Sequence, residues 1–231
     1  MPTSLVLAWL VHLYTALGAV VAFAAIIQIE QRLFVGALWL MLLAVVIDAT
    51  DGALARTARV KDHIPWFDGA LLDNIVDYTT YVLVPVYFIY RAELLPPQDG
   101  WWLAPLPLLA SAYGFCQKEA KTSDHFFQGF PSYWNVVAFY CYAFKTPPWI
   151  SGFAIIALSI SVFVPIRYLY PSRSPTQRSL VNTLGMLWAV LLAIILHQLP
   201  EPSHILLIAS LLFPAYYTAL SLWLEWHRAV D

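Results

Sequence analysis

Four aspartates lie in a short stretch of apolar sequence, at spacings that let them act together. Asp48 and Asp51 are three residues apart near the end of one apolar run, and Asp73 and Asp77 are four residues apart near the start of the next. Residues three or four positions apart lie on the same face of a helix. Each pair of carboxylates is therefore predicted to project from one helical face.

The two pairs are also predicted to lie at matching depth in a membrane. A helix that starts at Leu33 carries Asp48 about 22 Å along its axis, at roughly 1.5 Å per residue. Counting back from Arg91 to Asp77 gives about 21 Å in the same way. An antiparallel pair of helices would bring the four carboxylates together in the cytoplasmic third of the membrane.

Clustered carboxylates repel one another in a medium of low dielectric, so they must be protonated, paired with cations or bound to metal. Oxygen ligands suit hard cations such as Mg²⁺ or Mn²⁺ rather than zinc or copper. Gly52, Ala55 and Gly69 leave room beside the acids for a ligand, and Arg56 can reach a bound phosphate. The residues predict a metal site open to a substrate phosphate. The alternative is a set of structural ion pairs with the nearby arginines and lysine.

The composition places these acids in a membrane protein. Of the 231 residues, 61% are hydrophobic and only 11% are charged, against about 25% charged residues in soluble domains. The formal net charge of -2 provides no basic surface for nucleic acid, so nucleic-acid binding is not expected. The chain shows no repeat and no soluble segment, and we expect one membrane domain over residues 1–231.

Eight apolar segments approach the length of about 20 residues that a membrane-spanning helix needs. Their expected ranges are 5–28, 33–56, 69–91, 101–117, 131–146, 148–168, 178–199 and 203–226. An even number of spans puts both termini on one side. With the termini in the cytoplasm, nine of the twelve Lys and Arg residues lie on the inner side. The prediction is an all-α polytopic bundle with its active site near the cytoplasmic face.

A pattern of eight residues resembles the signature of the CDP-alcohol phosphotransferases, integral membrane enzymes that build phospholipids. The pattern reads Asp48-x2-Asp51-Gly52-x2-Ala55-Arg56, followed by Gly69-x3-Asp73-x3-Asp77. Most members have a shorter interval between the arginine and the second glycine than the 12 residues found here. That longer interval, and the segment from Lys121 to Asn135, resemble the bacterial phosphatidylcholine synthase branch.

The resemblance implies transfer of a phosphatidyl group from CDP-diacylglycerol to choline, which gives phosphatidylcholine and CMP. It implies that Mn²⁺ or Mg²⁺ is bound in a two-metal centre. The implied ligands are Asp48, Asp51 and Asp73, and Asp77 is implied as the general base and a further ligand. The implied CDP-binding residues are Gly52, Ala55, Arg56 and Gly69. A homodimer in the bacterial inner membrane, among membrane lipids, is also implied.

Choline carries a quaternary ammonium without an N–H donor, so a selective pocket needs aromatic faces and a carboxylate. The residues expected to supply them are Tyr78, Tyr81, Glu119, Asp124, Tyr133 and Trp134. For each aromatic ring the alternative is a place in the interfacial belt of a membrane protein.

Three other functions remain open from the sequence. Within the same class, the chain can be a phosphatidylserine synthase or another headgroup transferase. A cation transporter also uses intramembrane carboxylates, although such acids usually lie near the midplane on broken helices related by internal repeats. A purely structural membrane protein would give the pattern of aspartates and glycines no purpose.

Overall fold

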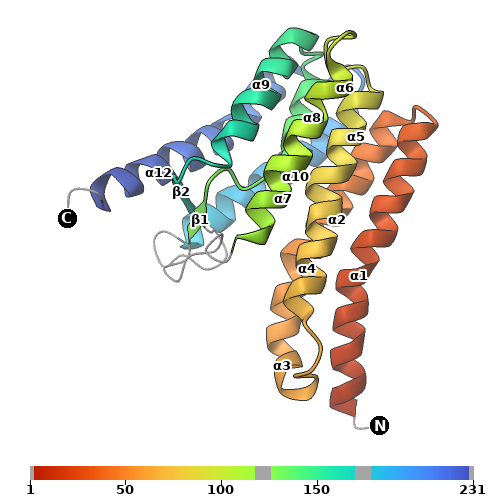
Figure 1. The fold of residues 1–231 in the computed structure, drawn as a ribbon, viewed down its shortest axis with the longest axis vertical. Coiled ribbons are helices and arrows are strands. Elements are labelled where there is room, and N and C mark those ends of the chain that lie inside the picture. Colours follow the sequence, from red (N-terminus) through yellow and green to blue (C-terminus); the bar gives the residue numbers. More distant parts are fainter. Residues whose placement is uncertain (1–2, 118–125, 170–177, 229–231) are drawn as a thin grey trace.

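The computed structural model describes residues 3–117, 126–169 and 178–228. The chain forms a bundle of helices with one small sheet at its side (Figure 1). The first two helices, α1 (Thr3–Glu30) and α2 (Phe34–Thr57), are the longest and pack along each other. Their contact uses small side chains, since Ala22, Ala25 and Ala37 are all buried.

A short helix, α3 (Val60–His63), leads from α2 into a second long helical rod. This rod consists of α4 (Gly69–Asp77), a π-helical segment η1 (Tyr78–Leu83) and α5 (Val84–Arg91). It begins where the Asp68 carboxylate accepts a hydrogen bond from the Leu71 amide at 2.9 Å, an N-terminal cap. Pro85 follows the π segment, and a proline inside a helix crowds the preceding turn and removes one N–H donor.

The other described elements are seven helices and two short strands. They are α6 (Gly100–Leu103), α7 (Pro105–Cys116), β1 (Phe126–Gln128), α8 (Trp134–Ala143), α9 (Pro148–Ser161), β2 (Arg167–Leu169), α10 (Arg178–Gln198), α11 (His204–Ser210) and α12 (Leu212–Arg228). Helices therefore occur within all eight predicted ranges.

The prediction that helix continues from residue 148 to 168 is wrong at its end. Helix α9 stops at Ser161, and Arg167–Leu169 forms a strand. Pro165 lies between them and disfavours helix for itself and for the residue before it. The all-α prediction thus needs one correction, a two-stranded antiparallel sheet that pairs Phe127 with Tyr168.

The sheet fixes the segment that precedes α8. Gly129 adopts φ +80°, and a Cβ built on it would lie 2.2 Å from the Val162 carbonyl oxygen. Only glycine allows both this conformation and this approach. The Phe130 amide also donates to the Ser161 carbonyl at 3.1 Å, so the segment is fastened to the end of α9.

The chain is a multi-pass membrane protein. Within the described residues, four helices are long and apolar enough to cross a membrane, namely Ser4–Glu30, Phe34–Thr57, Ser179–Gln198 and His204–Trp226. Large apolar side chains such as Leu13, Val20 and Phe23 are exposed on the outside of α1, as expected for a surface that faces lipid.

Candidate active site

Three of the four aspartates meet between α2 and the rod that follows it. Asp48 comes from α2, and Asp73 and Asp77 come from successive turns of α4. One carboxylate oxygen from each lies within 4.8 Å of the others, and all three side chains are half-buried. The spacing in the sequence predicted that four carboxylates would meet, and the structure brings three of them together.

Asp51 lies outside this group of three and is more deeply buried. Its side chain is 5% exposed, and its Oδ2 accepts a hydrogen bond of 2.7 Å from the Thr15 hydroxyl of α1. The motif of four aspartates does not include any residue of α1. The only sequence signal for Thr15 is a hydroxyl residue inside an otherwise apolar helix, which is a weak one.

The π segment brings a second hydroxyl to the cluster. Tyr81 donates to Asp48 Oδ2 at 2.6 Å, and Asp77 also acts electrostatically on the Tyr81 hydroxyl. Hydrogen bonds to carboxylates of this length are strong and stabilise the charged form. π segments inside helices often mark functional sites. Tyr81 therefore belongs to the acid cluster as well as to the predicted choline pocket.

Two of the predicted CDP-binding residues, Gly52 and Arg56, lie together on α2, and the other two, Ala55 and Gly69, pack toward α1. Arg56 is exposed, and its side chain folds back along α2 toward Gly52. A Cβ built on Gly52 would lie 3.4 Å from Arg56 Nη1. Ala55 instead packs against a small apolar cluster at the start of α1. Gly69 allows close contact with α1, since a Cβ there would lie 2.5 Å from His12 Cε1.

The predicted choline residues also divide. Tyr81 and Tyr133 lie together, with ring centroids 6.3 Å apart and an interplanar angle of 56°. Tyr78 faces α7, where its hydroxyl donates to the Leu108 carbonyl at 2.9 Å. Trp134 is fully buried and donates to Ser111 Oγ at 2.8 Å, which favours a packing role.

The two predicted anions of the choline site, Glu119 and Asp124, lie outside the described residues. One further tyrosine joins the described part of the pocket. Tyr217 of α12 forms a side-chain hydrogen bond with Tyr133, and both side chains are half-buried. Tyr217 was not predicted, because nothing in the local sequence of α12 relates it to a segment more than 80 residues earlier.

The donor set of the acid cluster fits a divalent metal ion. The donors are all carboxylate oxygens, and Mg²⁺ and Mn²⁺ prefer oxygen ligands to nitrogen or sulfur. Three half-buried carboxylates in an apolar bundle also need positive charge close by, because water screens them only in part. Asp48, Asp73 and Asp77 can therefore hold such an ion.

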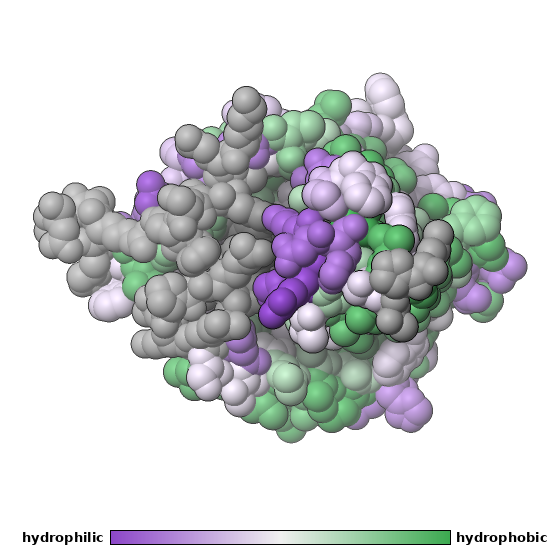
Figure 2. Space-filling model, turned by 90° about the horizontal axis from the view of Figure 1, so that it is seen from below, coloured by the Kyte–Doolittle hydropathy of each residue, from purple (hydrophilic) through white to green (hydrophobic). Residues whose placement is uncertain are grey.

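The end of the bundle that carries α3 exposes several charged side chains. Viewed from that end, a hydrophilic patch lies in the middle of the surface, with apolar side chains to its right (Figure 2). The charged side chains exposed in this part of the chain include Arg56, Arg59, Lys61 and Asp62. Asp48 lies nine residues before the end of α2 at Thr57, so the acid cluster is nearer to this end of the bundle than to the other.

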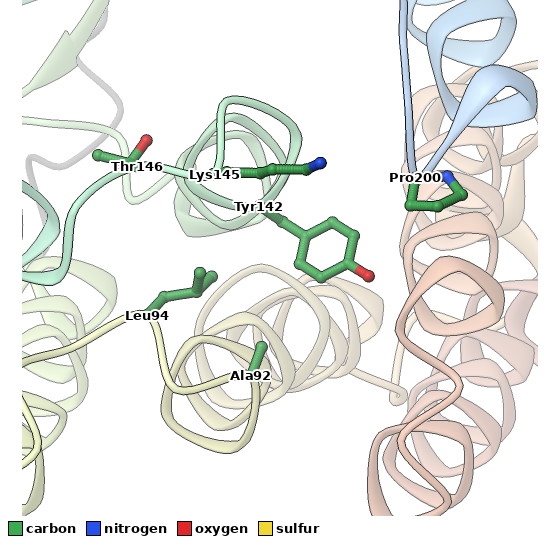
Figure 3. A pocket seen from close by; sticks show the side chains of 6 residues that line it. All are labelled: Ala92, Leu94, Tyr142, Lys145, Thr146 and Pro200. Carbon is green, nitrogen blue, oxygen red and sulfur yellow. The ribbon is translucent and has the colours of Figure 1, made fainter.

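A cavity of about 280 Å³ lies at the opposite end of the bundle. Its lining residues are Ala92, Leu94, Tyr142, Lys145, Thr146 and Pro200, and the side chains of Tyr142 and Lys145 extend toward Pro200 (Figure 3). None of the predicted site residues lines it. The cavity is therefore separate from the acid cluster.

Several bacterial proteins are similar to this chain over most of its length. The chain is 39% identical to a phosphatidylcholine synthase of Legionella pneumophila over 93% of its own length and 87% of that protein. It is 42% identical to a phosphatidylcholine synthase of Legionella bozemanae over 85% of its length and 94% of that protein. Identity to a phosphatidylcholine synthase of Pseudomonas aeruginosa is 34%, over 94% and 91% of the two chains. No protein-family model matches the chain.

The acid cluster predicts a specific loss of metal binding. We expect Asp73→Asn to weaken Mn²⁺ binding at least tenfold, because loss of even a supporting group around a metal costs about 10- to 100-fold in affinity. Electron paramagnetic resonance of free Mn²⁺, titrated with the detergent-purified protein, measures this. The exposed Asp62 of α3 provides the control, and Asp62→Asn is expected to bind as the unaltered protein does. Equal affinities in the two variants would place the metal elsewhere.

Proposed function

Because the chain belongs to the phosphatidylcholine synthase family, we propose that it transfers the phosphatidyl group of CDP-diacylglycerol to choline. The products are phosphatidylcholine and CMP. The observation that supports this chemistry in the fold is the meeting of Asp48, Asp73 and Asp77 within 4.8 Å. The proposal needs no soluble domain, since both the donor and the product are lipids.

The acid cluster is proposed to bind Mn²⁺ or Mg²⁺, and Asp51 is proposed as the fourth ligand of a two-metal centre. Divalent ions bound there supply positive charge for the pyrophosphate and for the oxygens that enter and leave. Arg56, which lies over Gly52 on the same helix, is proposed to hold a phosphate of the CDP moiety. Gly69 and Ala55 support that site by fixing the contact of α1 with α2 and α4.

The proposed displacement has one bond forming and one bond breaking. The choline hydroxyl oxygen attacks the phosphorus of the phosphatidyl group, and the bond from that phosphorus to the oxygen of CMP breaks. The hydroxyl proton passes to Asp77, and CMP leaves with the electron pair. A carboxylate of ordinary pKa is a weak base for an alcohol, so placing the hydroxyl in line is as important as removing its proton.

The choline ammonium is proposed to bind at the rings of Tyr81 and Tyr133, with Tyr217 behind Tyr133. The proposal is supported by the contact of the first two rings and by the link from Tyr81 to Asp48. A quaternary ammonium is attracted to aromatic faces within about 6 Å of the ring centre. Negative charge from the acid cluster adds to this attraction at short range.

The membrane arrangement is proposed from the same observations. Eight spans are proposed, because helices lie within all eight predicted ranges and because this count puts nine of the twelve basic residues in the cytoplasm. Both termini are then cytoplasmic, and residues 1–231 form one domain in the bacterial inner membrane. A homodimer is proposed from the resemblance to the CDP-alcohol phosphotransferases.

The acceptor assay tests the proposed function directly. Detergent-purified protein with Mn²⁺ or Mg²⁺ is given CDP-diacylglycerol and one of choline, serine, inositol or glycerol 3-phosphate, and CMP release is measured. We expect CMP and phosphatidylcholine with choline alone, and no product in the presence of EDTA. Activity with serine instead would retain the aspartate chemistry and overturn the acceptor. No CMP with any acceptor, from folded protein, would favour a transporter.

Substitution of Asp77 tests its role as the base. At saturating Mn²⁺, we expect Asp77→Asn to lower kcat about 10²- to 10⁴-fold, the range that general bases contribute. Retention of CDP-diacylglycerol, measured by equilibrium binding, is expected in the same preparation. A variant that bound the donor and turned over at the normal rate would exclude Asp77 as the base.

Substitution of Tyr133 tests the acceptor site. A cation–π contact of about 1–2 kcal/mol corresponds to a 5- to 30-fold change in binding. We expect Tyr133→Leu to raise the choline KM by this factor, and Tyr133→Phe, which keeps the ring, to raise it far less. The KM for CDP-diacylglycerol should not move. Tyr90→Leu, an exposed tyrosine near the far end of α5, is the control, and equal effects in both leucine variants would contradict the proposal.

A further inference from the structure

Thr15 connects α1 to the aspartates of α2 through a buried hydrogen bond. Its Oγ1 donates to Asp51 Oδ2 at 2.7 Å. Both side chains are buried, at 7% and 5% exposure. The two residues lie 36 positions apart in the chain, so the bond depends on how α1 packs and not on local sequence.

The Thr15 hydroxyl is committed to Asp51 rather than to its own helix. A hydroxyl has one hydrogen to donate, and a threonine in a helix usually gives it to the carbonyl four residues earlier. Thr50 does this, with its Oγ1 2.8 Å from the Val46 carbonyl. The corresponding distance from Thr15 to the Val11 carbonyl is 3.5 Å, far longer than its bond to Asp51.

Close contacts of α1 with α4 hold Thr15 in place on both sides. Three residues before it, His12 packs so tightly on Gly69 that a Cβ there would lie 2.5 Å from the imidazole. Three residues after it, a Cβ on Gly18 would lie 2.5 Å from the Val76 side chain. These contacts fix the register of α1 against α4, the helix that carries Asp73 and Asp77. The packing of α1 along α2 then brings Thr15 to Asp51.

We propose that Thr15 is a positioning residue of the metal site, whose hydroxyl orients the Asp51 carboxylate for a divalent cation. The inference rests on the proposed metal-dependent function, and it adds a residue from a helix that carries none of the aspartates. A short hydrogen bond from a hydroxyl to a carboxylate is strong and directional, so the Thr15 donor holds the Asp51 carboxylate in one orientation. Thr15 itself contacts no substrate atom in this role.

The test measures Mn²⁺ affinity in the full chain without substrates. Thr15→Val keeps the shape of the side chain and removes the hydroxyl, and we expect its Mn²⁺ dissociation constant to rise about 10- to 100-fold. Thr15→Ser restores the donor and is expected to bind within about twofold of the unaltered protein. At saturating Mn²⁺, kcat of Thr15→Val should recover to a large extent, which a general packing defect would not allow.

Tyr14→Phe provides a matched control. The Tyr14 hydroxyl is hydrogen-bonded to Thr50 Oγ1 at 2.8 Å. This bond also joins α1 to α2, one residue away from the Thr15–Asp51 bond on each helix, but its partner is a threonine and not an aspartate. Its loss is expected to leave Mn²⁺ affinity unchanged. Thr15→Ala serves as a second variant if the valine variant does not fold.

The Mn²⁺ affinities of these variants either support or overturn the role of Thr15. Unchanged or tighter Mn²⁺ binding in Thr15→Val or Thr15→Ala overturns the inference, as does an equal loss in Tyr14→Phe. An unaltered protein that binds no Mn²⁺ overturns both the metal site and the role of Thr15. Binding of Mn²⁺ that depends on Thr15, in a protein that makes no phosphatidylcholine, supports the inference and overturns the choline reaction alone.

Discussion

The repulsion among the carboxylates of Asp48, Asp73 and Asp77 is the constraint on which the site depends. Three such groups within 4.8 Å are unfavourable in an apolar bundle unless charge or donors compensate them. The Tyr81 hydroxyl meets part of that need by donating to Asp48. The neighbouring Asp51, outside the group of three, has its own donor in Thr15. A divalent cation can meet the rest, so the same repulsion that destabilises the empty cluster favours metal binding.

The fold brings α1, α2 and α4 together at the depth of the carboxylates. Helix α2 and the rod from Gly69 to Arg91 run in opposite directions, and Asp48 and Asp77 face each other because each lies at a similar distance from the shared end of the two helices. The π segment directly after Asp77 changes the helical register, and Tyr81 then reaches Asp48. Ion pairs at the far end, from Arg91 to Glu30 and from Glu93 to Arg32, fasten the end of the rod to the end of α1 and to the turn that follows it.

The sequence predicted those parts that local pattern determines. Apolar length located the helices, and the spacing of Asp73 and Asp77 placed both on one face. What it missed depends on tertiary register or on backbone detail. Thr15 and Tyr217 meet their partners only after distant helices have packed, and helix α9 ends early because the segment around Pro165 pairs as a strand. Asp51 shares a helical face with Asp48, but its burial against α1 is a tertiary effect that spacing does not encode.

Chemistry and acceptor choice are joined at one residue. The Tyr81 hydroxyl donates to Asp48, a proposed metal ligand, whereas the Tyr81 ring lies beside the Tyr133 ring. A change at Tyr81 therefore disturbs the carboxylate cluster and the proposed choline site together, so it cannot separate the two. Tyr133 comes from a segment that the sheet and Gly129 fasten to α9, outside the helices that carry the aspartates. The proposed choline site can therefore change through this segment while the aspartate cluster stays the same.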